Sequence, residues 1–348
     1  MEIGSENYTD SAKRGKNDYY NLVDCPKRYV LSGRTGLGLI SQELKARAKS
    51  VFMPNYCCGS MIYPFVNEGF NIFFYDAFDL SNVIIDERVD AVLLMDYFGF
   101  LSSTTASFAK RCKEMGKIVI VDATQTAFSA SSTYEVADYI VVSYRKWFDC
   151  LCGVVYSKDD FVTKEYEQEN EAYYSLWRTA ALLKRQFIKK GLGEKSKFLS
   201  LYSQANSLLD GEYRNFKANA QEVSYLASVD SNEIRRQRRT NASFLIEKIN
   251  KLSKIYNVEL LYSKIQLEDC PLFVPILVDE IKKDTIRKSL SNANIYCPAH
   301  WPIDRRYSFE ETDYHKREIS LICDQRYSAE DMELQIAVLI DALKNSSK

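Results

Sequence analysis

Three short, nearly continuous apolar runs constrain the fold of this chain most strongly. They are "AVLLMDYF" at residues 91–98, "KIVIVDA" at 117–123 and "DYIVVSY" at 138–144. Runs of this length that are rich in β-branched residues are typical of parallel strands buried on both faces of a sheet. We therefore expect these segments to be strands of one mainly parallel sheet.

The segment between the first two runs predicts a helix. It reads "SSTTASFAKRCKEMGK" over residues 102–117. A Ser or Thr can cap its start, Phe108 and Cys112 share one face, and Gly116 can end it. A strand, a helix and a second strand in this order form a βαβ unit, so the predicted fold class is α/β.

The chain is long enough for two domains of unequal size, with 348 residues of which 46% are hydrophobic. After about residue 160 the pattern becomes helical and polar, and later segments read as further strands and helices. The expected strands are residues 257–262 and 270–279, and the expected helices are 279–295 and 328–345. We expect a large domain over 1–215, with the N-terminal segment and connecting helices, and a smaller C-terminal α+β domain over 216–348.

The composition argues against several classes of partner. The formal net charge of -1, from 46 basic and 47 acidic side chains, gives no general attraction to nucleic acid or to an anionic membrane. No apolar run approaches the ~20 residues of a membrane helix, and the N-terminus lacks the apolar region of a signal peptide. Nine scattered cysteines are typical of a reduced cytoplasmic protein.

A metal site is not expected. The chain has only two histidines, and its cysteine spacings do not match the CxxC pairs of zinc sites.

Polar side chains follow the three predicted strands. Asp96 and Tyr97 come with the first strand, Asp122 ends the second, and Ser143 and Lys146 follow the third. Ligands of parallel sheets collect at the carboxyl ends of the strands. These side chains therefore form a candidate site.

The stretch "SGRTG" at residues 32–36 precedes a helix whose apolar face is Leu37, Ile40 and Leu44. Glycines at such a point let backbone N–H groups approach an anion, and the helix dipole favours a phosphate there. Neither the dinucleotide pattern GxGxxG nor the Walker pattern GxxxxGK[ST] is present. The alternative interpretation is a simple turn with a helix cap.

Asp122 and Lys146 suggest a specific chemistry. A carboxylate at the end of an apolar strand needs a cationic or multiply donating partner, and the protonated ring nitrogen of a pyridine cofactor is one. A desolvated lysine becomes a nucleophilic amine that can form a Schiff base, and Ser143 could donate to a phosphate beside it. The alternatives are a helix N-cap for Asp122 and an exposed loop position for Lys146.

Six segments in order carry a resemblance to a known family. They are SGRTG (32–36), "MPNYCCGSMIYPFVNEGF" (53–70), DYFG (96–99), DATQ (122–125), SYRK (143–146) and "YCPAHWP" (296–302). Together they resemble the DegT/DnrJ/StrS family of sugar aminotransferases, which are pyridoxal phosphate (PLP) enzymes of fold type I. The closing "ISLICDQRYSAEDME" (319–333) is also similar to that family, so the resemblance runs nearly end to end.

The resemblance implies pyridoxal 5'-phosphate as the cofactor and assigns roles to residues of this chain. Lys146 would be the Schiff-base lysine and the proton shuttle, and Asp122 would hold the pyridinium N–H. Gln125 would lie against the cofactor ring, while Tyr97 and His300 would line the substrate side. The implied phosphate ligands are Ser143, Arg34 and Thr35.

The reaction that the resemblance implies moves an amino group from glutamate to a keto sugar linked to a nucleotide. Arg34 or Arg145 could bind the carboxylate of the amino donor. The implied assembly is a homodimer, and the implied pathways are cell-surface polysaccharide or antibiotic sugar biosynthesis.

The sequence departs from the family pattern at three places. The interval from Ser143 to Lys146 is shorter than usual, and Cys58 stands where many members place an aromatic ring that stacks on PLP. No Gly-Tyr-Asn stretch is found at residues 205–225. Two alternatives therefore stay open. One is a lyase or dehydratase type of reaction, against which Lys146 argues because the dehydratase members have His in its place. The other is a non-catalytic relative of the same fold.

Overall fold

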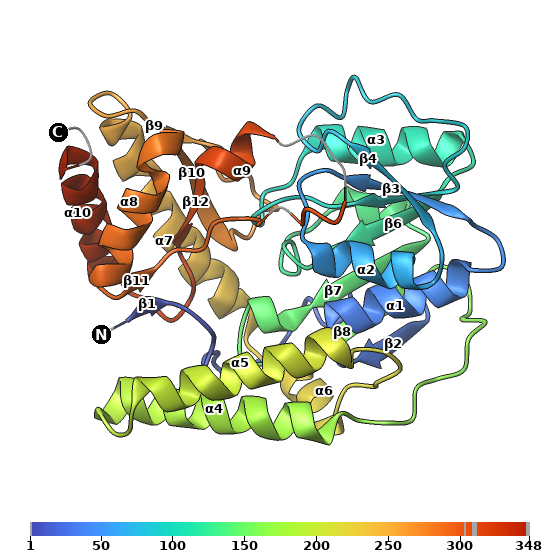
Figure 1. Ribbon diagram of the computed structural model, residues 1–348, viewed down its shortest axis with the longest axis horizontal. Helices are drawn as coiled ribbons and strands as arrows, with labels where there is room; N and C mark the ends of the chain where they lie inside the picture. The colour runs from blue at the N-terminus through green and yellow to red at the C-terminus, as the bar shows by residue number, and fades with distance from the viewer. Residues whose placement is uncertain (1, 303, 308–311, 346–348) are drawn as a thin grey trace.

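The computed structural model describes residues 2–302, 304–307 and 312–345 (Figure 1). Its largest element is a seven-stranded sheet in the order β2-β8-β7-β6-β5-β3-β4. Strand β8 is antiparallel to both of its neighbours, and the other neighbouring pairs are parallel. The strands are β2 (Lys27–Val30), β3 (Ser50–Pro54), β4 (Asn71–Tyr75), β5 (Ala91–Leu94), β6 (Ile118–Asp122), β7 (Tyr139–Ser143) and β8 (Gly153–Ser157).

The three strands predicted from the apolar runs are confirmed as β5, β6 and β7, which are neighbours in this sheet. The helix predicted between the first two is α3 (Ser103–Glu114), whose N-cap is Ser102. Because β3, β5, β6 and β7 are parallel, their carboxyl ends meet at one edge of the sheet. The polar clusters that follow β5, β6 and β7 therefore start from the same edge.

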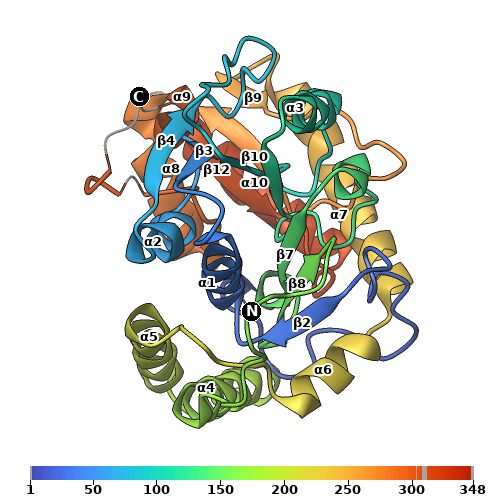
Figure 2. The same cartoon turned by 90° about the vertical axis from the view of Figure 1, so that its right-hand side faces the viewer.

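Helices cover both faces of the sheet (Figure 2), as a sheet buried on both sides requires. Leu93 packs in one core with Leu37 and Ile40 of α1 (Gly33–Leu44), and α2 (Gly59–Asn67) contributes to the same core. Leu94 packs in another core with Phe108 of α3. Successive strand residues thus point to opposite faces.

The second part of the chain is built around a smaller antiparallel sheet in the order β12-β10-β9. Its strands are β9 (Val258–Leu260), β10 (Phe273–Val278) and β12 (Glu318–Ile322), and its helices are α7 (Ser231–Leu252), α8 (Glu280–Asn292), the short α9 (Asp313–Arg317) and α10 (Ala329–Asn345). The expected strands and helices of this region are confirmed. Ser328 and Asp331 form the expected start of α10, since the Ser328 N–H donates to Asp331 Oδ2 at 2.8 Å.

Two long antiparallel helices lie below the large sheet in Figure 1. They are α4 (Glu171–Lys190) and α5 (Lys195–Gly211), and α6 (Ala220–Ala227) follows them. The short 3-10 helices are η1 (Ser132–Glu135) and η2 (Tyr144–Lys146).

The basic run at residues 233–241 lies on α7. Its composition is typical of a solvated helix face, but one of its members is buried. Arg238 is only 1% exposed. It donates to the carbonyl of Leu272 at 3.0 Å and stacks 4.6 Å above the Trp147 ring. Trp147 and the carbonyl groups around it compensate for the burial of this guanidinium.

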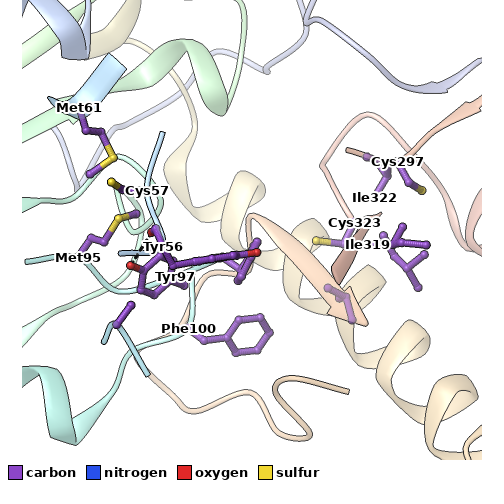
Figure 3. Close-up of a cluster of buried hydrophobic side chains, with 14 of the residues drawn as sticks. Tyr56, Cys57, Met61, Met95, Tyr97, Phe100, Cys297, Ile319, Ile322 and Cys323 are labelled. Carbon is purple, nitrogen blue, oxygen red and sulfur yellow. Dashed lines mark hydrogen bonds between the residues drawn. The ribbon is translucent and has the colours of Figure 1, made fainter. Parts of the chain in front are cut away.

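The two parts of the chain share a core. Figure 3 shows aromatic side chains from the edge of the large sheet, among them Tyr56 and Tyr97, facing Ile319 and Ile322 of the small sheet. All four belong to one buried cluster. The first strand, β1 (Ile3–Gly4), also pairs in parallel with β11 (Ile295–Tyr296), so the start of the chain lies against C-terminal elements. The division at residue 215 stays a prediction.

None of the helices in the described ranges is long and apolar enough to span a bilayer.

A buried carboxyl at the carboxyl edge of the large sheet gives a first prediction. Asp96 follows β5, accepts the N–H of Ser102 at 3.1 Å, and burial raises its pKa from 3.8 to about 7. Between these two values the native state binds a proton that the unfolded state releases, so the free energy of unfolding falls as the pH rises through this window. In Asp96→Asn, urea unfolding at pH 5 and pH 8 should show a smaller pH dependence than in the unsubstituted protein. An unchanged dependence would contradict the assignment.

Candidate active site

A cavity of about 560 Å³ opens at the carboxyl edge of the large sheet and extends to residues beside the small sheet. Its walls come from the loops after β2, β3, β6 and β7 and from segments near β1, β11 and β12. Most of the residues singled out from the sequence line it. They are Lys146, Asp122, Gln125, Ser143, Arg34 and His300.

Lys146 ends the 3-10 helix that follows β7 and reaches solvent where it lines the cavity. The surrounding protein desolvates its amine, which is the main reason that its pKa is lowered, and the positive charge of Arg145 adds to this effect. The charges of Glu6 and Cys58 act in the opposite direction. A lysine with a lowered pKa has a larger neutral, nucleophilic fraction at neutral pH.

Asp122 ends β6 and is 5% exposed. Burial raises its pKa, opposed by its hydrogen bonds with Thr124, whose N–H donates to Oδ1 at 2.9 Å, and by the charge of Lys146. No α-helix starts at this point in the described chain, so the predicted alternative of a helix N-cap is wrong and Asp122 instead orders a turn. The carboxylate lines the cavity and is placed to accept a donor from a ligand.

The start of α1 forms a concave cradle beside Ser143. Ser32 caps the helix by accepting the N–H of Thr35 at 3.1 Å. A Cβ on Gly33 would lie 3.0 Å from the Ser143 Cβ, closer than most side-chain contacts. Only a glycine lets the helix start and Ser143 approach this closely, and the free N–H groups of a helix start suit an anion.

Two arginine side chains near this cradle are held in place by other residues of the protein. Arg34 forms an ion pair with Asp210 at 2.6 Å, and its buried Nε has no acceptor. Arg145 lines the cavity, donates to Asn206 Oδ1 at 3.0 Å and stacks 4.7 Å from the Trp177 ring. Both guanidinium groups are therefore oriented before any ligand binds.

Thr35 and Tyr97 are not part of the cavity wall that the described residues form. The Thr35 hydroxyl donates to the carbonyl of Tyr213 at 2.7 Å, so this side chain fixes the start of α1. The Tyr97 hydroxyl donates to the carbonyl of Tyr56 at 2.8 Å (Figure 3). Each side chain uses its polar group inside the protein.

His300 lies on the cavity wall opposite the large sheet. Its backbone N–H donates to Glu318 Oε2 at 2.7 Å, and its Nδ1 lies 3.0 Å from the Ser320 hydroxyl. On the other wall, Gln125 Oε1 accepts the N–H of Phe98. These bonds hold both side chains in one orientation.

Several cavity residues were not predicted from the sequence. Glu6 lines the cavity because β1 pairs with β11, and its carbonyl accepts Lys184 Nζ at 2.6 Å and Arg326 Nη1 at 3.2 Å. Arg238 and Arg326 also line it. A short N-terminal strand gives no periodic signal, so only the fold places Glu6 here.

The sequence matches no protein-family model and no curated protein. Solved structures match over nearly the whole chain. Helicobacter pylori PseC, an aminotransferase involved in the biosynthesis of pseudoaminic acid, is 15% identical, with a TM-score of 0.71 over 99% of this chain and 100% of that one. The chain has the fold of this aminotransferase.

Two further solved structures have the same fold. NtdA of Bacillus subtilis, solved with the bound cofactor PMP, is 13% identical, with a TM-score of 0.64 over 95% of this chain and 78% of that one. A DegT/DnrJ/EryC1/StrS aminotransferase from Brucella abortus is 14% identical, with a TM-score of 0.58 over 91% of this chain and 86% of that one. The fold expected from the sequence resemblance, PLP-dependent fold type I, is confirmed.

The residues of the cavity fit PLP. The cofactor needs an acid for its ring nitrogen, an amine for its aldehyde and an anion site for its phosphate. Asp122 supplies a buried carboxylate, and Lys146 supplies a desolvated amine. The cradle between Gly33 and Ser143 supplies the N-terminus of a helix. The described residues contain no group of three or more His, Cys, Asp or Glu side chains suited to a metal ion.

Proposed function

We propose that this protein is a PLP-dependent aminotransferase that moves an amino group from glutamate to a keto sugar carried on a nucleotide. The observation that carries the proposal is that Lys146, Asp122 and Ser143 line one cavity in a chain with this fold. The resemblance of the sequence to sugar aminotransferases supports the choice of substrates.

Each residue has a role that follows from its position. PLP supplies an electron sink when it is bound. Asp122 would keep the ring nitrogen protonated, because a buried carboxylate strongly favours a neighbouring positive charge. Lys146 would hold the cofactor and later move a proton, since its lowered pKa leaves the amine able to accept one. Ser143 and Arg34 would hold the phosphate.

Arg145 joins this group in our proposal. Arg145 precedes Lys146 in the sequence and lines the same cavity. Its guanidinium could bind either the phosphate or the carboxylate of the amino donor. Thr35 contributes through the helix start that its side chain stabilises. In the described part of the chain, Tyr97 lies outside the cavity lining and would support the substrate-binding part of the cavity wall. His300 lines the cavity and would face the substrate.

A two-step reaction tests the proposal. The PLP-loaded protein is mixed with glutamate, and the change in the visible spectrum and the formation of 2-oxoglutarate are followed. A nucleotide-linked keto sugar is then added, and the aminated sugar is detected by mass spectrometry. We expect both steps. PLP binding without any 2-oxoglutarate would favour a lyase or dehydratase type of reaction, and no PLP binding would favour a non-catalytic relative.

The remaining properties are inferred from the chain as a whole. We infer a homodimer, as the resemblance implies, and light scattering after size-exclusion chromatography measures its mass.

We also place the protein in the cytoplasm, because its cysteines are free thiols in the structure and most are buried, as in proteins of reducing compartments.

A further inference from the structure

A second cavity of about 430 Å³ lies in the small domain, between α8, α9 and the segment 299–302. It shares Arg287, His300 and Trp301 with the active-site cavity. The two cavities therefore adjoin at these three side chains.

Two cations one helical turn apart face this second cavity. Lys283 and Arg287 both belong to α8 and both line it, and Lys316 of α9 adds a third positive charge. Like charges at positions i and i+4 of a helix repel each other. Burial lowers the pKa of Lys283, and the charge of Arg287 also lowers it, against the opposing charge of Glu318.

The acidic side chains nearby balance these cations only in part. Asp284 lies 3.9 Å from Arg287, but its side chain is 95% exposed, and an ion pair so exposed contributes little. Glu318 already accepts from the His300 N–H and from the Ser320 hydroxyl. Glu280 and Asp284 are the two acidic residues that the described chain places on the wall of the second cavity.

One donor of this cluster has no acceptor. Arg287 Nε is buried and makes no hydrogen bond, while Lys283 Nζ donates to the carbonyl of His315 at 2.6 Å. A buried N–H group of a cation without an acceptor is costly. A bound anion would supply the missing acceptor and would relieve the repulsion between the two cations.

We propose that Lys283, Arg287 and Lys316 form a subsite for the diphosphate group of the acceptor substrate. This inference rests on the proposed function. A nucleotide-linked sugar is a long molecule, so its diphosphate can lie in the second cavity while the sugar passes His300 and Trp301 toward Lys146. Arginine binds phosphate oxygens through two parallel N–H groups and lysine through a point charge.

Binding of a free nucleoside diphosphate to the PLP-loaded protein tests this subsite. Calorimetry with UDP and with TDP is carried out on the unsubstituted protein, Lys283→Met and Arg287→Met. Each variant should weaken binding by roughly tenfold or more, and high salt should reduce the difference. Arg287→Lys should restore part of the affinity. Lys288→Met is the matched control, because Lys288 is exposed on the same helix and is not part of the wall of either cavity; its affinity should stay within about twofold.

Reaction with glutamate separates this subsite from other roles of the same cations. The half-reaction with glutamate should proceed unchanged in Lys283→Met, because Lys283 lines the second cavity and is not part of the active-site wall in the described structure. A raised KM for glutamate with unchanged diphosphate affinity would assign the cluster to the donor carboxylate and overturn the inference, as would equal diphosphate binding by all variants. If diphosphate binding depends on Arg287 but the unsubstituted protein does not react with glutamate, the subsite stands and the proposed aminotransferase function falls.

Discussion

Lys146→Ala should reduce turnover at least about a thousandfold, because one side chain both holds the cofactor and moves the proton. The amine is desolvated in the cavity wall, and water in the space left by the truncated side chain cannot replace a positioned nucleophile. Amino transfer from glutamate to the acceptor is the measurement. Turnover within tenfold of the unsubstituted protein would contradict the role of Lys146.

Lys146→Arg is the control for charge. It keeps a positive charge at the same place in the cavity, but a guanidinium cannot act as the nucleophile. We expect it to be as inactive as Lys146→Ala. Both variants should unfold at temperatures close to that of the unsubstituted protein. Lys146 is exposed to the cavity, so its substitution removes little packing from the folded state.

Asp122→Asn should lower turnover by roughly a hundredfold to a thousandfold, which corresponds to about 3–4 kcal/mol of lost electrostatic stabilisation in a water-excluded site. The amide cannot keep a ring nitrogen protonated, so the cofactor would lose much of its capacity as an electron sink. Stability should change much less, because the amide oxygen can still accept the N–H of Thr124. Turnover of the PLP-loaded variant and its thermal unfolding are the two measurements.

Asp96→Asn is the matched control for Asp122→Asn. Both carboxyls lie at the carboxyl ends of neighbouring strands, both are 5% exposed and burial raises the pKa of both. Asp96, however, does not line the cavity in the described structure. Equal losses of turnover in the two variants would mean that Asp122 acts only by stabilising the sheet edge.

The central sheet could be predicted because its strands are buried on both faces. Apolar runs such as residues 138–144 have no other stable place in a chain of this size, and the β-branched residues favour strands over helices. The antiparallel strand β8 and the order of strands could not be read from the same runs, because burial does not specify which neighbour a strand pairs with.

The candidate site could be predicted in part for the same reason. Lys146, Asp122 and Ser143 follow strands, so the parallel sheet alone brings them to one edge. Thr35 and Tyr97 have similar positions in the sequence, but local hydrogen bonds turn their hydroxyls into the protein. Side-chain direction depends on such contacts, which sequence spacing does not report.

Residues contributed by distant segments could not be predicted. Glu6 reaches the cavity through the pairing of β1 with β11, and Arg287 through the packing of α8 beside the segment at His300. Arg238 lay in a run that has the composition of a solvated helix face, yet Trp147 and backbone carbonyls bury it. Pairings between segments so far apart in the chain leave no local pattern.

Chemical trapping of the cofactor tests the central claim most directly. The purified protein is mixed with PLP, reduced with borohydride and digested, and the modified peptide is identified by mass spectrometry. The account predicts one PLP group per chain, on Lys146. A PLP group on another lysine, or no modification of a folded protein that has been saturated with PLP, would contradict it.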